Sequence, residues 1–198
     1  LSRLLIAFAH HNASPSTGKI SVLANVFKAV KKLQSREGPS YGEELAMNVA
    51  EWGGTEETIV AALLGGLATE KGLDEWPTHW QSDFEIDQSL FQKAQEMAWR
   101  WKRTDQVPFT LNQLSLSQIR NQMGLILTEE LIKGNNDDQV FLLTLMGKSL
   151  LIKRVDPQRQ SKIRLELEYL YAPLAERSGQ DALATELLDS AFLGFAPE

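Results

Sequence analysis

Residues 55–66 read TEETIVAALLGG, and this stretch decides the fold class. Residues 59–64 are apolar without interruption, which is typical of a helix that is buried on all sides. Thr55 is suited to cap the helix, and the two glutamates that follow it lie where the positive end of the helix dipole favours carboxylates. The pattern predicts a central buried helix that ends at Gly65 and Gly66, because glycine commonly stops helices.

Helical spacing of apolar residues recurs through the rest of the chain, and neither strand alternation nor a repeat of fixed period is present. Ser82 and Glu85 have the spacing of a capping box ahead of a helix that reaches Trp101. Other helices are expected over residues 2–11, 20–33, 45–50, 116–131, 137–152, 163–171 and 181–193. The expected fold is all-α, a bundle of about eight to ten helices.

Length and composition indicate one ordinary globular domain over residues 1–198. The formal charge of −6 argues against a nucleic-acid surface spread over the whole protein. No apolar run approaches the ~18 residues of a membrane span, and no leader pattern is present, so we expect a cytoplasmic protein without a membrane partner.

The charged residues near Trp99 and Trp101 allow two interpretations. Arg100, Lys102 and Arg103 could bind a phosphate-bearing partner, but cations at the end of a helix ordinarily offset its dipole. We favour the second interpretation and regard nucleic-acid binding as the weaker alternative.

Metal ligands are scarce in the sequence. There is no cysteine, His10 and His11 are adjacent and point in different directions on a helix, and His79 lies in a loop-like stretch. The acidic residues between 70 and 83 could collect a cation such as magnesium, but their spacing matches no calcium loop. We expect a solvated acidic loop there and no cofactor.

Three later segments carry motifs that follow the first stretch in a recognisable order. They read LIKRVD at residues 151–156, YAPLAERSG at residues 171–179 and ELLDSAF at residues 186–192. Together with residues 55–66 they resemble the hydrolase domain of the RelA/SpoT (p)ppGpp synthetase/hydrolase family, whose segments read ETxxAALLHD, LIKLAD, YAPLAHRLG and ELEDLAF. The resemblance implies an HD-domain-like helical fold over the whole chain.

The resemblance also implies where a metal site would lie. Active relatives hold manganese through a histidine, a His-Asp pair and a later aspartate, and these positions fall on Tyr41, on Gly65 and Gly66, and on Asp156. Glycine has no side chain and a neutral tyrosine binds manganese poorly, so three of the four ligands are missing and the metal site should be lost.

The catalytic acidic pair of the family falls on Thr69 and Glu70. Glu70 could still act as a base, but without a metal to lower the pKa of the attacking water most of the rate enhancement should disappear. The vestigial cleft would then consist of Tyr41, Gly65, Gly66, Lys153 and Asp156. We expect Asp156 to lie at a helix end or in a salt bridge.

The resemblance therefore predicts a catalytically inactive HD domain that acts as a regulatory, ligand-binding or interaction module. Its expected partners are a guanine nucleotide, a protein, or the adjacent synthetase domain found in long relatives. The alternative is a metal-dependent phosphohydrolase with a rearranged site, which would use Glu70 and Asp156 with a metal recruited partly by substrate phosphates.

Overall fold

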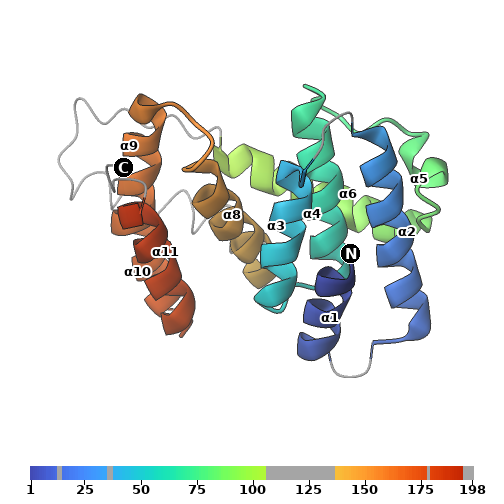
Figure 1. The fold of residues 1–198 in the computed structure, drawn as a ribbon, viewed down its shortest axis with the longest axis horizontal. Helices are drawn as coiled ribbons and strands as arrows, with labels where there is room; N and C mark the ends of the chain where they lie inside the picture. The colour runs from blue at the N-terminus through green and yellow to red at the C-terminus, as the bar shows by residue number, and fades with distance from the viewer. Residues whose placement is uncertain (13–14, 35–37, 106–136, 178, 194–198) are drawn as a thin grey trace. The chain divides into compact units, whose positions relative to one another are not determined.

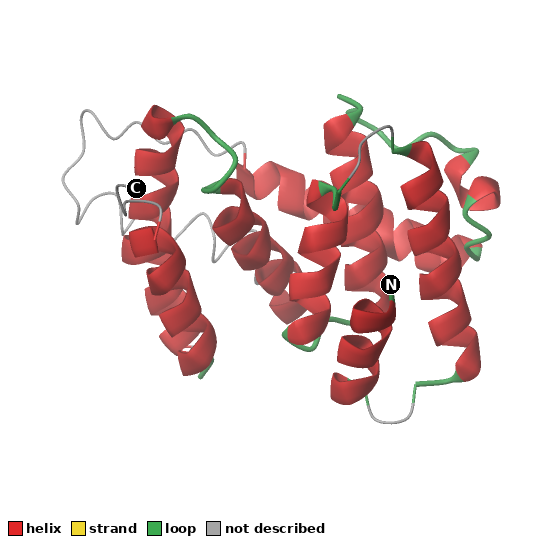
Figure 2. Cartoon of the chain, in the orientation of Figure 1, coloured by secondary structure: helices red, strands yellow, loops and turns green. Residues whose placement is uncertain are grey.

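The structure is a computed structural model that describes residues 1–12, 15–34, 38–105, 137–177 and 179–193 (Figure 1). Every regular element in these ranges is a helix (Figure 2). The elements are α1 (Ser2–His11), α2 (Thr17–Leu33), α3 (Tyr41–Glu51), α4 (Glu56–Glu70), α5 (Trp80–Asp83), α6 (Gln88–Asp105), α8 (Asp137–Leu151), α9 (Pro157–Glu166), the π-helix η1 (Leu167–Tyr171), α10 (Ala172–Arg177) and α11 (Asp181–Leu193). Because α9, η1 and α10 follow one another without a break, the described ranges hold nine helices, which confirms the all-α prediction. The helix predicted over residues 116–131 lies outside the described residues.

The contacts between residues group the chain into two compact units. The N-terminal unit contains Leu1–Asp105 and the first part of α8, Asp138–Leu143. Of the described residues, the C-terminal unit holds Asp137, Thr144–Arg177 and Gly179–Leu193. Compact units of this kind occur within one domain as well as in separate domains, so the single domain expected over residues 1–198 stays a prediction.

Helix α4 forms the centre of the N-terminal unit, with α2, α3 and α6 packed against it (Figure 1). Every residue from Thr58 to Ala68 is buried. This agrees with the uninterrupted apolar run, because a helix without a polar face can be stable only when neighbours cover it on all sides.

Side-chain caps fix the starts of α3 and α4. At α3, Ser40 accepts a hydrogen bond from the amide of Glu43, and the Glu43 carboxylate accepts one from the amide of Ser40, which makes a capping box. At α4, Thr55 accepts from the amide of Thr58, as predicted. Gln139 from α8 accepts hydrogen bonds from the Thr55 amide and the Thr58 hydroxyl, so a distant part of the chain completes this cap.

The capping box predicted at Ser82 and Glu85 is wrong. Ser82 lies inside α5 and its hydroxyl donates to the carbonyl of His79, while Glu85 has a φ of 54° and belongs to the turn that follows α5. Asp87 caps α6 instead, because its carboxylate accepts a hydrogen bond from the amide of Leu90. The two residues that the sequence pattern assigned to a capping box therefore lie in α5 and in the turn after it.

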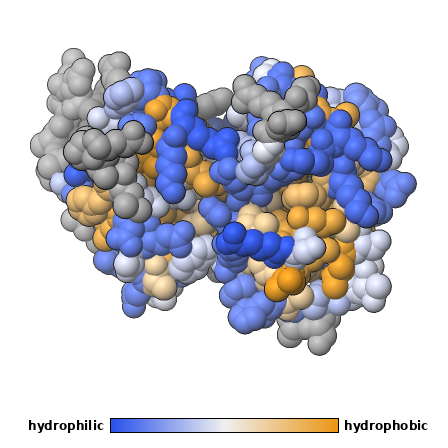
Figure 3. Space-filling view, in the orientation of Figure 1, coloured by the Kyte–Doolittle hydropathy of each residue, from blue (hydrophilic) through white to orange (hydrophobic). Residues whose placement is uncertain are grey.

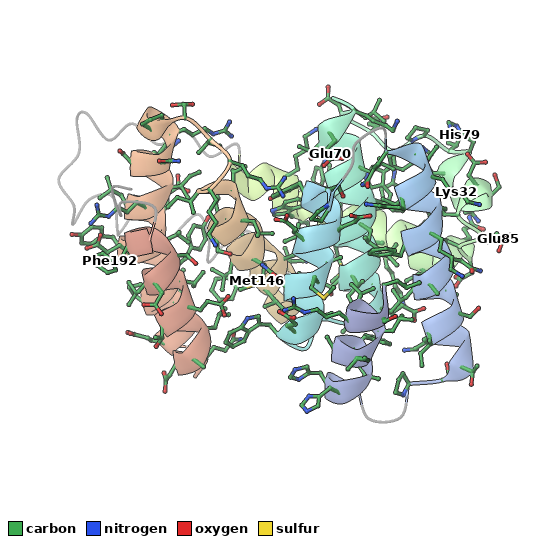
Figure 4. The ribbon with its side chains drawn as sticks, viewed as in Figure 1. Lys32, Glu70, His79, Glu85, Met146 and Phe192 are labelled. Atoms are coloured by element: carbon green, nitrogen blue, oxygen red, sulfur yellow. The ribbon has the colours of Figure 1, made fainter. Side chains whose placement is uncertain are left out.

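The C-terminal unit packs α11 against α9, η1 and α10. The π-helix η1 sits at the expected boundary before Ala172 and Pro173 and keeps Tyr171 buried. Lys148 and Glu166 form a buried ion pair with 3.0 Å between Nζ and Oε2. The Cζ atom of Arg164 in α9 lies 5.4 Å from the ring centre of Phe192 in α11, an exposed residue that is labelled in Figure 4.

The surface of the N-terminal unit shows an apolar area over α1 and α2 in the hydropathy view (Figure 3). Ile6 in α1 is 71% exposed. Within the part of the chain that the structure describes, no helix is long and apolar enough to cross a membrane.

Candidate functional site

The predicted end of α4 at Gly65 and Gly66 is wrong, and the correction changes what these glycines do. Helix α4 continues for a further turn, to Glu70. Both glycines are buried inside the helix, where glycine costs about 1 kcal/mol relative to alanine. Their neighbours explain why the helix keeps them, because each glycine meets another element at short range.

Gly66 lies against the backbone of α3. A Cβ atom placed on Gly66 would lie 2.6 Å from the amide nitrogen of Gly42 and would also clash with the Cα of Gly42. In the other direction, a Cβ on Gly42 would lie 2.8 Å from the carbonyl oxygen of Leu63. Helices α3 and α4 therefore cross at a pair of glycines, and neither position has room for a side chain.

Gly65 faces α6 instead of α3. A Cβ atom on Gly65 would lie 3.1 Å from the ring of Trp101 and 3.3 Å from the Cβ of Ala98. Trp101 also stacks on Tyr41, with 6.2 Å between ring centres and 22° between the ring planes. The indole of Trp101 thus contacts Tyr41 and lies close to Gly65, two positions at which the resembled enzymes carry metal ligands.

Glu70 and Thr69 both make hydrogen bonds at the end of α4, where Figure 4 shows Glu70. The Glu70 carboxylate accepts a hydrogen bond of 2.9 Å from the amide of Tyr41, the first residue of α3. The Thr69 hydroxyl donates to the carbonyl of Gly65 one turn earlier. Glu70 therefore accepts a hydrogen bond from a first-turn amide that has no acceptor within its own helix, and its negative charge suits that end of the helix dipole.

The predicted site residues are divided between the two units. Tyr41, Gly66 and Glu70 come together where α3 and α4 meet in the N-terminal unit, and Gly65 and Thr69 lie on the same turns of α4. Lys153 and Asp156 belong to the C-terminal unit and are exposed.

Asp156 caps α9 in the C-terminal unit. Its carboxylate accepts a hydrogen bond of 3.1 Å from the amide of Arg159, and Pro157 takes the first helical position, where a missing N–H is no loss. This placement agrees with the interpretation of Asp156 as a helix-terminal carboxylate.

The residues present do not fit the manganese centre of the resembled enzymes. Gly65 and Gly66 offer no donor atom, and the backbone of Gly42 fills the space into which a side chain at position 66 would extend. Among the described residues, no group of three or more histidine and acidic side chains could hold a metal ion. His79 lies beside α5 and apart from Glu70 (Figure 4), and its nearest acidic partner is Asp83.

Lys102 from the basic cluster ties α6 to the loop after α4. Its ammonium group lies 2.9 Å from a carboxylate oxygen of Asp74 and 3.3 Å from the carbonyl oxygen of Leu73. The side chain of Arg103 lies outside the described part of the structure. Lys102 thus has a structural role that neither interpretation of the basic cluster included.

A cavity of about 380 Å³ opens beside Gly65. Its described walls are the last turns of α4, residues 73–76 of the following loop, and residues 92–102 of α6. Three tryptophans line it, namely Trp76, Trp99 and Trp101, and its volume is typical of small-molecule sites.

The role of Gly42 and the cavity were not predicted from the sequence. A glycine in the first turn of one helix and a glycine pair in the next were the available signal for the close crossing. The cavity had no such signal, because its walls come from three segments that only the packing of α6 on α4 brings together.

The sequence matches no family model, and a search of curated proteins gives no match either. The resemblance to the RelA/SpoT hydrolase domain therefore stays a prediction that rests on the four segments quoted above.

Proposed function

We propose that this chain is a RelA/SpoT-type HD domain that no longer hydrolyses (p)ppGpp and acts as a regulatory module through ligand or partner binding. We also propose that the protein is located in the cytoplasm. Its candidate partners are a guanine nucleotide, a protein and an adjacent synthetase domain.

One observation carries the proposal, namely the contact between Gly66 and Gly42. In the family pattern position 66 supplies an aspartate ligand, which needs open space on that side of the helix. Here the backbone of α3 occupies the space, so the loss of the ligand is built into the helix packing. A phosphohydrolase of this kind needs its metal to activate water and to neutralise the substrate's phosphates.

The remaining acidic candidates have structural partners, which also supports a non-catalytic module. Glu70 holds the start of α3, and Asp156 holds the start of α9. A general base must be able to turn its carboxylate toward a water molecule, and each of these carboxylates would lose a helix-capping hydrogen bond by doing so.

The direct test is to incubate the purified chain with ppGpp and excess manganese and to separate the nucleotides by ion-exchange chromatography. An active manganese-dependent (p)ppGpp hydrolase serves as the positive control, and metal content is measured on the same samples. We expect no GDP and no bound manganese. Release of GDP together with stoichiometric manganese would overturn the proposal.

Binding is tested separately by titrating the chain with ppGpp, GDP and GTP in a calorimeter, without manganese. Saturable binding of a nucleotide without turnover would identify it as the ligand of the module. If none of the three binds, a protein or the synthetase domain is the next partner to titrate.

A further inference from the structure

The cavity beside Gly65 has walls of a distinctive charge. Among the described lining residues, three are acidic and one is basic: Asp74, Glu75, Glu96 and Lys102. Lys102 is paired with Asp74 at 2.9 Å, so these two charges largely offset each other. Glu75 and Glu96 then leave the lining with a net negative charge, in a protein whose overall formal charge is −6.

The cavity is also rich in tryptophan. Trp76, Trp99 and Trp101 all line it, although the whole chain contains only five tryptophans. Of these three lining residues, Trp76 and Trp101 are buried, whereas Trp99 is 54% exposed. An indole ring attracts cations more strongly than other aromatic side chains do, because its face carries negative charge density.

We propose that this cavity binds a small organic cation, an ammonium group with alkyl substituents. The tryptophans contact the alkyl groups and attract the positive charge, and Glu75 and Glu96 neutralise it. The inference goes beyond the proposed function, because it concerns a ligand other than a nucleotide, and it uses only the cavity and none of the vestigial metal positions except Gly65.

The same charge argues against a nucleotide in this cavity. The phosphates of a guanine nucleotide would approach Glu75 and Glu96, and the one basic residue of the described lining is already paired. The tryptophans could stack on a base as well as on a cation, so a nucleoside without phosphates is the ligand that the test must distinguish.

The probes are choline and its neutral carbon isostere, 3,3-dimethyl-1-butanol, which have nearly the same shape and differ in charge. Guanosine, a nucleoside without phosphates, is the third probe. Binding is followed on the full chain from the five tryptophan indole N–H signals in ¹H–¹⁵N NMR spectra. We expect choline to shift the signals of the lining tryptophans and to leave that of Trp52 unchanged, since Trp52 does not line the cavity. We expect the isostere to bind at least about tenfold more weakly.

Substitutions test the carboxylates and the tryptophans of the site separately. Glu75→Gln/Glu96→Gln should weaken choline binding about tenfold without changing the weak binding of the isostere. The matched control, Glu186→Gln/Asp189→Asn, removes the same charge from exposed residues of α11 and should leave choline binding unchanged. Trp99→Leu keeps an apolar side chain but removes the indole, and it should weaken choline binding about fivefold.

Three outcomes would overturn the inference. These are equal affinity for choline and its isostere, binding of guanosine without binding of choline, and unchanged choline affinity in the Glu75→Gln/Glu96→Gln variant. Hydrolysis of ppGpp in the manganese assay would overturn the proposed function but would leave choline binding as it is. The two experiments therefore distinguish failure of the proposed function from failure of the proposed cation site.

Discussion

Gly66 in α4 and Gly42 in α3 meet backbone to backbone, so that a Cβ atom on Gly42 would lie 3.2 Å from the Cα of Gly66. This contact lets the two helices pack closely at the point where the resembled enzymes would need a side chain from α4. The glycine pair thus links the helix packing of the N-terminal unit to the absence of a metal ligand at position 66.

Gly66→Ala should destabilise the protein by about 3 kcal/mol, since the new methyl group meets backbone that cannot rotate away. Gly18→Ala in α2 is the matched control, because its Cβ would have only one neighbour, 3.8 Å away. It should stabilise the protein by about 0.5–1 kcal/mol through helix propensity. Urea unfolding of both variants measures the difference, and equal stability would show that α3 and α4 do not cross as described.

Restoring the family's residues with Gly65→His/Gly66→Asp should not restore hydrolysis of ppGpp. Tyr41 still occupies the first ligand position, and the aspartate would have to push α3 away from α4. We expect a lower melting temperature than that of the wild type and no GDP in the manganese assay. Robust hydrolysis by this variant would show that the ligand positions are assigned wrongly.

Glu70→Ala should cost about 1 kcal/mol of stability, because the amide of Tyr41 loses its hydrogen-bond acceptor. Glu70→Gln keeps an oxygen acceptor and should lose less than half as much, through the weaker interaction with the helix dipole. Thermal unfolding of the two variants checks the order. If alanine and glutamine lower the melting temperature equally, the contact with α3 is not what Glu70 contributes.

The pair Lys148 and Glu166 can be tested by a double-mutant cycle. Both side chains are less than 8% exposed, so Lys148→Met should leave a buried carboxylate without its cation and cost about 3–5 kcal/mol. Lys148→Met/Glu166→Leu should recover most of that loss, because no charge is then left buried.

Lys162→Met is the control for this cycle. Lys162 lies 4.0 Å from the other carboxylate oxygen of Glu166 and is 36% exposed, so its removal should cost less than about 1 kcal/mol. A large loss in Lys162→Met, or none in Lys148→Met, would contradict the burial of the pair.

Glu56 should make stability fall as pH rises. Burial raises the pKa of its carboxyl above the ordinary 4.5, with Lys19 opposing the shift and the carboxylates of Glu57 and Asp87 adding to it. The folded protein then holds the proton more tightly than the unfolded chain, so the contribution of Glu56 is fully present below pH 4.5 and is lost as the pH rises through the raised value.

Glu56→Gln removes this titration. The melting temperature of Glu56→Gln should therefore rise relative to that of the wild type as the pH increases from about 4 to about 7, a range that begins just below the ordinary pKa. Glu186→Gln, which changes an exposed glutamate of α11, should follow the wild type across the range. A constant difference between Glu56→Gln and the wild type would contradict the raised pKa.

Local patterns predicted helices more reliably than helix ends. The apolar run at residues 59–64 and the cap at Thr55 fixed α4, since both act within a few residues along the chain. The end of α4 was predicted four residues too early because glycine is a helix stop only where nothing else favours continuation. Here burial between α3 and α6 stabilises the extra turn, and Glu70 at its end bonds to Tyr41.

In the candidate site too, features set by nearby residues could be predicted from the sequence, and features set by distant residues could not. The lack of donor atoms at Gly65 and Gly66 follows from residue type alone, and the cap formed by Asp156 follows from its place before Pro157 and α9. The hydrogen bond from Tyr41 to Glu70 joins residues 29 positions apart, and no local rule predicts it.

By itself, then, the sequence determined that this protein is helical and that its central helix is buried, because periodicity and capping are set by neighbouring residues. Only the tertiary structure decided that Gly66 is closed off by Gly42 and that Trp101 lies over Gly65. It also decided that three tryptophans and, among the described residues, three carboxylates line one cavity. These features depend on distances between elements, which arise when α3 and α6 pack on α4 to bury its apolar surface.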